Sequence, residues 1–143
     1  MDHYWSQAPE TAAIIREPLD WLGSWYRYRR RSELLGTPQS TADVSFAKFV
    51  ETYLLQDKTP FAHVGQQSKF LKNASKDYPM HLWRYDDLEG LKKFLGDQLS
   101  VKIKLPHLNA SEDLELDLPK TLRKEAEAFF KDDYQLYENA KHA

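Results

Sequence analysis

The sequence predicts a helix-rich α/β fold with few strands. Two short apolar runs, TAAII at residues 11–15 and MHLWRY at residues 80–85, have the length and composition of strands. Several other segments repeat apolar residues at helical spacing. We therefore expect two short strands among several helices.

The first helix is predicted from Pro18 to about Ser32. Proline suits a first helical position, and the carboxylate of Asp20 suits the positive end of a helix dipole. We expect Leu22 and the two tryptophans of this helix, Trp21 and Trp25, to be mostly buried because they share its apolar face.

The later helices follow from capping residues and from apolar spacing. Ser45 is expected to cap a second helix, GQQSKFLKN at residues 65–73 to start a short one, and Asp86 or Asp87 to cap a fourth. A last helical stretch begins at Pro119, with a break at Asp132-Asp133. VKIKL at residues 101–105 alternates apolar and charged residues, which indicates a half-exposed strand or an extended segment.

Composition limits the classes of protein that fit. The length of 143 residues suits one domain, residues 1–143, with residues 1–10 as a flexible lead-in. The net charge of −2 disfavours a nucleic-acid partner, and no apolar run is long enough for a membrane helix. The sequence has no cysteine, and no histidine pair has metal-ligand spacing, so we expect no metal site and a cytoplasmic protein.

The segment REPLDWLGSWYRYRRR, residues 16–31, carries the candidate binding residues. On a helical wheel, Ser24, Arg27 and Arg31 fall in one stripe, and Arg16 closes the preceding strand. Guanidinium groups, a hydroxyl and a helix start together suit a small anion such as phosphate. The alternative is a solvated helix end, whose cations complement the helix dipole.

Arg16, Pro18 and Ser24 also resemble, in type and spacing, the 3′-phosphate-binding motif of sulfotransferases that use 3′-phosphoadenosine 5′-phosphosulfate (PAPS). Later segments, VGQQSKFL, LWRYDDLEGLKKFL, LPHLNAS and DDYQLYE, resemble bacterial members related to carbohydrate sulfotransferases, so the likeness spans residues 12–138. The resemblance implies a partial sulfotransferase fold, P-loop nucleotide-kinase-like, with a small and mainly parallel sheet. It also implies that Arg16 and Ser24 converge on the 3′-phosphate of PAPS or adenosine 3′,5′-bisphosphate.

The same resemblance implies transfer of a sulfuryl group to a hydroxyl or amine acceptor, which includes carbohydrates. The family's 5′-phosphosulfate loop and its catalytic base have no counterpart in residues 1–15, so the chain is expected to be truncated or degenerate and inactive alone. The alternative is a non-catalytic nucleotide-binding, phosphate-binding or protein-interaction module. A sheet without its first strands would expose an edge, which favours a homo-oligomer.

A few further residues are weaker candidates. His63 and His3 are the histidines to consider as a base, although each suits an ordinary loop position. Gln66 and Gln67 could line a cleft or begin a polar helix.

Overall fold

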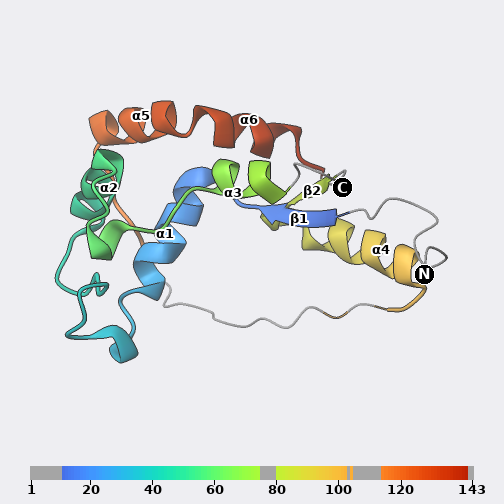
Figure 1. Ribbon diagram of the computed structural model, residues 1–143, viewed down its shortest axis with the longest axis horizontal. Helices are drawn as coiled ribbons and strands as arrows, with labels where there is room; N and C mark the ends of the chain where they lie inside the picture. Colours follow the sequence, from blue (N-terminus) through green and yellow to red (C-terminus); the bar gives the residue numbers. More distant parts are fainter. Residues whose placement is uncertain (1–10, 75–79, 103, 105–113, 142–143) are drawn as a thin grey trace. The chain divides into compact units, whose positions relative to one another are not determined.

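The computed structural model describes residues 11–74, 80–102, 104 and 114–141. Its described part contains two strands and six α-helices (Figure 1). In chain order these are β1 Thr11–Ile15, α1 Pro18–Tyr28, α2 Phe46–Leu55, α3 Gln67–Ala74, β2 Met80–Arg84, α4 Leu88–Leu99, α5 Lys120–Phe129 and α6 Lys131–Asn139. The prediction of a helix-rich α/β fold is confirmed.

The chain divides into two compact units, which are described separately. Unit 1 comprises Met1–Glu17, Gly65–Leu105 and Gln135–Ala143, and unit 2 comprises Pro18–Val64 and Pro106–Tyr134. Unit 1 therefore contains both strands, whereas unit 2 contains α1, α2 and α5.

Unit 1 is built around the pair β1–β2. The strands are parallel, with Ile15 opposite Arg84 in the register, which agrees with the expected parallel sheet. Ile15, Leu71 of α3 and Ala140 form a small buried cluster on one face. Phe94 of α4 packs against Trp83 on β2, with ring centroids 5.6 Å apart. Residues 101, 102 and 104 are not in a strand, and the rest of the predicted segment 101–105 lies outside the described residues.

The edge of β2 that faces away from β1 forms hydrogen bonds with Lys141, the last described residue of the chain. The backbone N–H of Lys141 donates to the carbonyl of Leu82 at 2.8 Å, and the N–H of Arg84 donates to the carbonyl of Lys141 at 3.1 Å. A single residue thus continues the sheet beyond β2. Among the residues that the structure describes, β1 lies at the opposite edge of this sheet.

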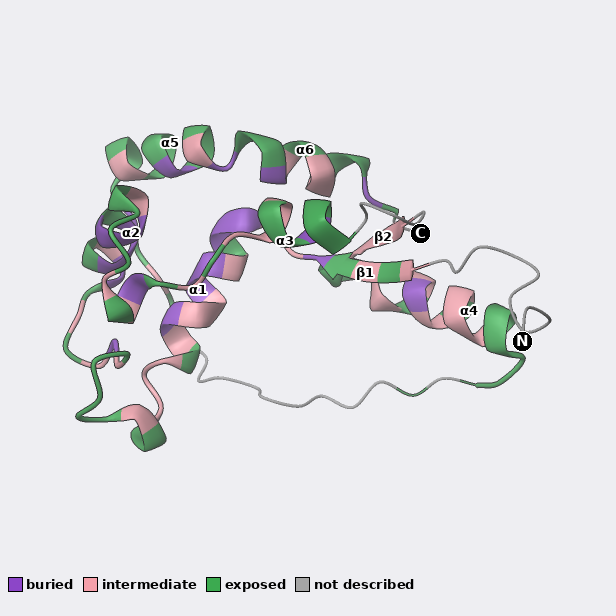
Figure 2. Cartoon of the chain, in the orientation of Figure 1, coloured by how far each residue is buried: buried purple, intermediate pink, exposed green. Residues whose placement is uncertain are grey.

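Unit 2 has the larger core. Its buried residues come from α1, α2, α5 and the segments beside them, as the purple positions in Figure 2 show. Aromatic rings dominate this core: Tyr53 stacks on Phe130 at 5.6 Å, and Tyr26 meets Phe49 edge to face at 5.5 Å. Burial of such rings is the main stabilising contribution that this unit has available.

α1 ends at Tyr28, earlier than the predicted end near Ser32. The hydroxyl of Thr41, a fully buried residue, donates to the carbonyl of Tyr26 at 2.7 Å, and the N–H of Thr41 donates to the carbonyl of Arg29. These bonds satisfy carbonyls that a helix end leaves without partners. The sequence pattern did not show this loop contact, because Thr41 is distant in sequence from α1.

The apolar face of α1 packs on the core of unit 2 as the wheel predicted. Leu22 is fully buried, and Trp21 and Trp25 are partly buried and pack against the core. Trp21 meets Phe130 edge to face at 6.4 Å, and Trp25 meets Tyr28 at 5.9 Å. The prediction that Leu22, Trp21 and Trp25 are mostly buried is therefore confirmed, although part of each large tryptophan ring still reaches solvent.

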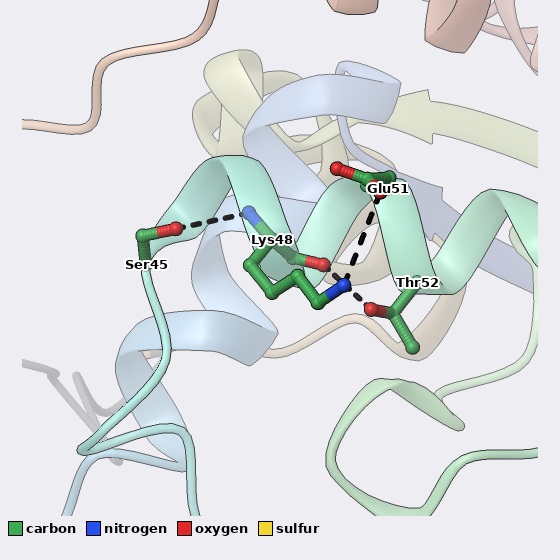
Figure 3. Close-up of polar contacts among 4 residues, drawn as sticks. All are labelled: Ser45, Lys48, Glu51 and Thr52. Carbon is green, nitrogen blue, oxygen red and sulfur yellow. Dashed lines mark hydrogen bonds and ion pairs between the residues drawn. The ribbon is translucent and has the colours of Figure 1, made fainter.

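Two predicted helix caps are confirmed. The hydroxyl oxygen of Ser45 accepts a hydrogen bond from the backbone N–H of Lys48 at 3.0 Å (Figure 3). The side-chain Nζ of Lys48 also forms an ion pair with Oε1 of Glu51 at 3.9 Å. Asp87 caps α4 by accepting from the N–H of Gly90 at 3.3 Å. The break in the last helical stretch falls at Phe130, before the predicted Asp132-Asp133.

Gly90→Ala is expected to destabilise the protein by about 1–3 kcal/mol, the usual cost of overpacking. A Cβ atom at this position would lie 2.8 Å from Cζ3 of Trp83 and 3.0 Å from the carboxylate of Asp87, the capping residue. In an open helix the same change would stabilise by about 1 kcal/mol.

Urea unfolding followed by tryptophan fluorescence measures this change, with Gln98→Ala, an exposed position on α4, as the matched control. An unfolding free energy that stays equal or rises in Gly90→Ala would contradict the contact with Trp83.

Candidate functional site

Arg16 directly follows β1, at the carboxyl end of the parallel strand pair. The side-chain amide of Gln67 clamps its backbone: the N–H of Arg16 donates to Oε1 at 3.0 Å, and Nε2 donates to the carbonyl of Arg16 at 3.0 Å. This clamp extends the strand's hydrogen bonding by one residue and fixes where the Arg16 side chain begins. Open parallel sheets generally bind ligands beyond the carboxyl ends of their strands.

The guanidinium of Arg16 lies over the ring of Tyr85, with Cζ 4.3 Å from the ring centroid. Tyr85 directly follows β2, so the register that pairs Ile15 with Arg84 makes Arg16 and Tyr85 the next pair. A stacked guanidinium contacts the ring with its flat face, whereas its N–H donors point outward in the plane of the group. The tyrosine ring, 40% exposed, therefore positions a cation near the surface of unit 1.

Arg84 has a structural role at the same end of the sheet. Its Nε donates to the carbonyl of Tyr137 at 2.9 Å, and its Nη2 donates to the carbonyl of Glu138 at 3.3 Å. Both carbonyls lie in the last turn of α6, where a cation also complements the helix dipole. Arg84 thus fastens α6 to β2.

Two carboxylates lie in the same part of unit 1. Asp86 accepts a hydrogen bond from the hydroxyl of Tyr137 at 3.0 Å. Burial raises the pKa of Tyr137, and the hydrogen bond to Asp86 and the charges of Asp86 and Glu17 add to this rise, while Arg84 opposes it. The carboxyl end of the sheet therefore carries both signs of charge, with Arg16 as the cation stacked on Tyr85.

Ser24 lies on α1 in unit 2, whereas Arg16 belongs to unit 1. The hydroxyl of Ser24 donates to the carbonyl of Trp21 one turn earlier, at 2.6 Å. This bond within the helix is a common way for a mid-helix serine to satisfy its hydroxyl. The convergence of Arg16 and Ser24 on one anion stays a prediction.

Two arginines that follow Ser24, Arg29 and Arg30, form hydrogen bonds with loop carbonyls of unit 2. Arg29 donates to the carbonyls of Pro60 at 2.8 Å and His63 at 3.1 Å, and burial lowers the pKa of its guanidinium. Arg30 donates to the hydroxyl of Tyr26 at 3.1 Å and lies within 3.4 Å of two loop carbonyls. This role differs from both sequence interpretations, the anion site and the solvated helix end.

Arg27 and Arg31, the other predicted binding residues, also have contacts within unit 2. Nε of Arg27 donates to the carbonyl of Leu114 at 2.8 Å. Arg31 lies beyond the end of α1, with its guanidinium over the ring of Tyr28 at 4.4 Å. The wheel stripe therefore does not reach Arg31, because the helix stops first. Binding of a ligand by Arg27 or Arg31 stays a prediction.

The remaining candidates have ordinary surroundings. His63 is an exposed loop residue whose carbonyl accepts from Arg29, and His3 lies outside the described residues. Gln66 precedes α3, and Gln67 is the clamp on Arg16 rather than part of an identified cleft. Within the described residues, no group of histidine and carboxylate side chains could hold a metal ion. No helix in the described ranges has the length and apolar content to cross a membrane.

Sequence reasoning missed Tyr85 and the clamping role of Gln67. Tyr85 was placed at the end of a strand, but its pairing with Arg16 depends on the parallel register. The signal was the position of both residues directly after an apolar run. The clamp by Gln67 has no sequence signal, because it spans 51 residues of chain.

The chain is similar to part of the NAD-dependent histone deacetylase sir2 of Schizosaccharomyces pombe (strain 972 / ATCC 24843), with 30% identity over 109 residues. This match covers 74% of the chain but 19% of the relative, so the chain spans about a fifth of that protein. No family model matches the chain, and no solved structure matches it.

These comparisons correct the predicted family. They give an NAD-dependent deacetylase, a different class of enzyme, and no sulfotransferase, so the predicted sulfuryl transfer and the predicted donor, PAPS or adenosine 3′,5′-bisphosphate, are wrong. The three-residue motif has local explanations: Pro18 is the first residue of α1, and Ser24 bonds within that helix. The comparisons also lend no support to the alternative of a binding or interaction module.

Proposed function

We propose that Arg16 recognises an anionic group of a small molecule at the carboxyl end of β1 and β2. The observation that supports this proposal most directly is the stacking of the Arg16 guanidinium on Tyr85, beside a backbone clamped by Gln67. A fixed and stacked guanidinium presents its N–H edge in a defined direction, which suits a planar carboxylate or a phosphate oxygen pair.

The charges near Arg16 determine how strongly an anion is expected to bind there. Glu17 and Asp86 lie in the same part of unit 1 and oppose an incoming anion, although Asp86 is engaged by the Tyr137 hydroxyl. Arg84 adds positive charge while it holds α6. Opposed charges of this kind give weak binding that is sensitive to ionic strength.

NAD is the first anion to test, because the sir2 relative is NAD-dependent and NAD carries a pyrophosphate. The proposal is limited to recognition of the anion. The five glycines of the sequence, at positions 23, 36, 65, 90 and 96, do not form the G-x-G-x-x-G fingerprint of dinucleotide-binding folds. Deacetylation is therefore not proposed for this chain.

Arg16→Ala is expected to reduce the affinity for pyrophosphate or NAD by about tenfold, the order that one charge-assisted hydrogen bond contributes. Titration calorimetry at low ionic strength measures the affinity, with acetate as a separate arm that distinguishes carboxylate from phosphate recognition. Arg123→Ala, which removes an exposed arginine from α5, is the matched control.

Equal affinity in wild type and Arg16→Ala would contradict the proposal. Tyr85→Leu removes the stacking surface and keeps Arg16, so it should reduce affinity by a smaller factor. Ser24→Ala, Arg27→Ala and Arg31→Ala test the residues of unit 2. A loss of affinity in any of them would support a part for that residue in anion binding.

The cytoplasmic location and the formation of a homo-oligomer stay proposals. The described helices are consistent with a protein that does not span a membrane. The position of β1 at an edge of the sheet supports self-association.

A further inference from the structure

Four arginines at the end of α1 carry positive charge that no described carboxylate neutralises. They are Arg27, Arg29, Arg30 and Arg31. Their side-chain hydrogen bonds go to backbone carbonyls and to one tyrosine hydroxyl, and none forms an ion pair within the described residues. Residues 25–35 contain these four arginines and one acid, Glu33, so the local charge is +3 although the chain as a whole carries −2. This local charge favours an anionic partner.

Aromatic rings lie between two of these arginines. The guanidinium of Arg31 lies over the ring of Tyr28, with Cζ 4.4 Å from the centroid, and Cζ of Arg29 lies 5.4 Å from the centroid of Trp25. The two rings meet each other edge to face at 5.9 Å. The four side chains form a continuous row, Arg31–Tyr28–Trp25–Arg29, which we call the aromatic–arginine row. Tyr28 is 38% exposed and the other three are partly buried, so the row reaches the surface of unit 2.

Unit 2 fixes this row but leaves part of its hydrogen-bonding capacity unused. Arg29 is held by two loop carbonyls. The side chain of Arg31 donates no hydrogen bond to a described residue, and Arg27, one turn earlier in the chain, donates through its Nε alone, to the carbonyl of Leu114. Since a guanidinium has five N–H donors, Arg27 and Arg31 keep donors that suit phosphate oxygens.

We infer that the aromatic–arginine row, together with Arg27, binds single-stranded nucleic acid. Phosphate oxygens of the strand accept from the remaining donors of Arg27 and Arg31. A base stacks on the outer face of the Arg31 guanidinium, whose inner face lies on Tyr28, because bases stack on guanidinium planes as well as on aromatic rings. The strand is unpaired, because the bases of a duplex are already stacked on one another. An acidic peptide supplies anions but no flat rings, so the row fits it less well.

The inference does not depend on anion binding by Arg16, which lies in unit 1. Arg16→Ala should lower the affinity for pyrophosphate and leave the affinity for an oligonucleotide unchanged. Tyr28→Ala should do the reverse. These two variants therefore distinguish a failure of one proposal from a failure of the other.

Fluorescence anisotropy with labelled oligouridylate and oligothymidylate of about 12 nucleotides, within the usual range of site sizes, tests the inference. Arg31→Ala and Tyr28→Ala should each raise the dissociation constant about fivefold or more, whereas Tyr28→Phe, which keeps the ring, should not change it. Binding of either strand with this pattern supports the inference. Arg123→Ala, which removes an exposed arginine on α5 of the same unit, is the matched control and should have no effect.

The salt dependence of binding gives a second readout. Two phosphate contacts predict a slope of about −1.4 for the logarithm of the binding constant against that of the salt concentration, since each contact on a single strand contributes about −0.7. Arg31→Ala should reduce the magnitude of this slope by about 0.7, whereas Tyr28→Ala should weaken binding and keep the slope. A slope that Arg31→Ala leaves unchanged would contradict a phosphate contact at Arg31.

Circular dichroism checks that each variant keeps its helix content. Because the Arg31 side chain donates no hydrogen bond to a described residue, Arg31→Ala is expected to fold even if Tyr28→Ala does not. Absence of binding at low salt, or an equal loss of affinity in Arg123→Ala, would overturn the inference. So would a duplex of the same length that binds as tightly as the single strand, or an oligoglutamate peptide that competes equally well, because neither result requires a stacked base.

Discussion

Phe130→Ala is expected to lower the free energy of unfolding by about 3–5 kcal/mol, the usual loss for a buried phenylalanine in a core. Phe130 is fully buried at the junction of α5 and α6. Its ring stacks on Tyr53 at 5.6 Å and meets Phe129 at 5.2 Å and Trp21 at 6.4 Å. Truncation removes these ring contacts and leaves a cavity between α1, α2 and α5.

The matched control is Phe70→Ala, which removes the same side chain from a position that is 73% exposed on α3. This control should change the unfolding free energy by about 0.5 kcal/mol or less. Urea unfolding of both variants, followed by circular dichroism, gives the comparison. Equal losses in the two variants would show that Phe130 is not part of a tightly packed core.

The sequence predicted the elements whose signals are local. TAAII and the segment beginning at Met80 are strands, Ser45 and Asp87 are caps, and Leu22 is buried. Each of these depends on residues within one or two turns of chain. Side-chain spacing and capping chemistry therefore contain enough information to place them.

The end of α1 was not predictable in the same way. The helix ends at Tyr28, where Thr41 of a distant loop donates hydrogen bonds to the carbonyls of Tyr26 and Arg29. The wheel continued the helix through Arg31, which produced a stripe of arginines that the structure does not contain. Tertiary contacts therefore decided where this helix ends.

The candidate site shows the same division between local and tertiary information. Arg16 was identified from its place at the end of a strand, which is a local signal. Its partners Tyr85 and Gln67 come from far along the chain, so no spacing rule connects them with Arg16. The resemblance built on Arg16, Pro18 and Ser24 was wrong about the family because helix start and helix back-bonding already explain Pro18 and Ser24.

Raising the pH above 10 is expected to destabilise unit 2 through Tyr53. Tyr53 is 2% exposed, and burial raises the pKa of its phenol, with the charge of Asp133, a fully buried residue, adding to the rise. The unfolded chain releases this proton near the ordinary pKa of 10.0, whereas the folded chain keeps it. The unfolded state therefore binds fewer protons above pH 10, and stability falls as the pH rises.

While the folded phenol stays protonated, this loss approaches about 1.4 kcal/mol for each pH unit above 10. Tyr53→Phe keeps the ring that stacks on Phe130 and removes the titrating group, so the difference between wild type and this variant isolates Tyr53 from the other tyrosines. Asp133→Asn should lower the pKa of Tyr53, because the charge of Asp133 adds to its rise. Unfolding free energies from urea titrations at pH 9, 10 and 11 measure the slopes. Parallel curves for wild type and Tyr53→Phe would show that the Tyr53 phenol titrates alike in the folded and unfolded states.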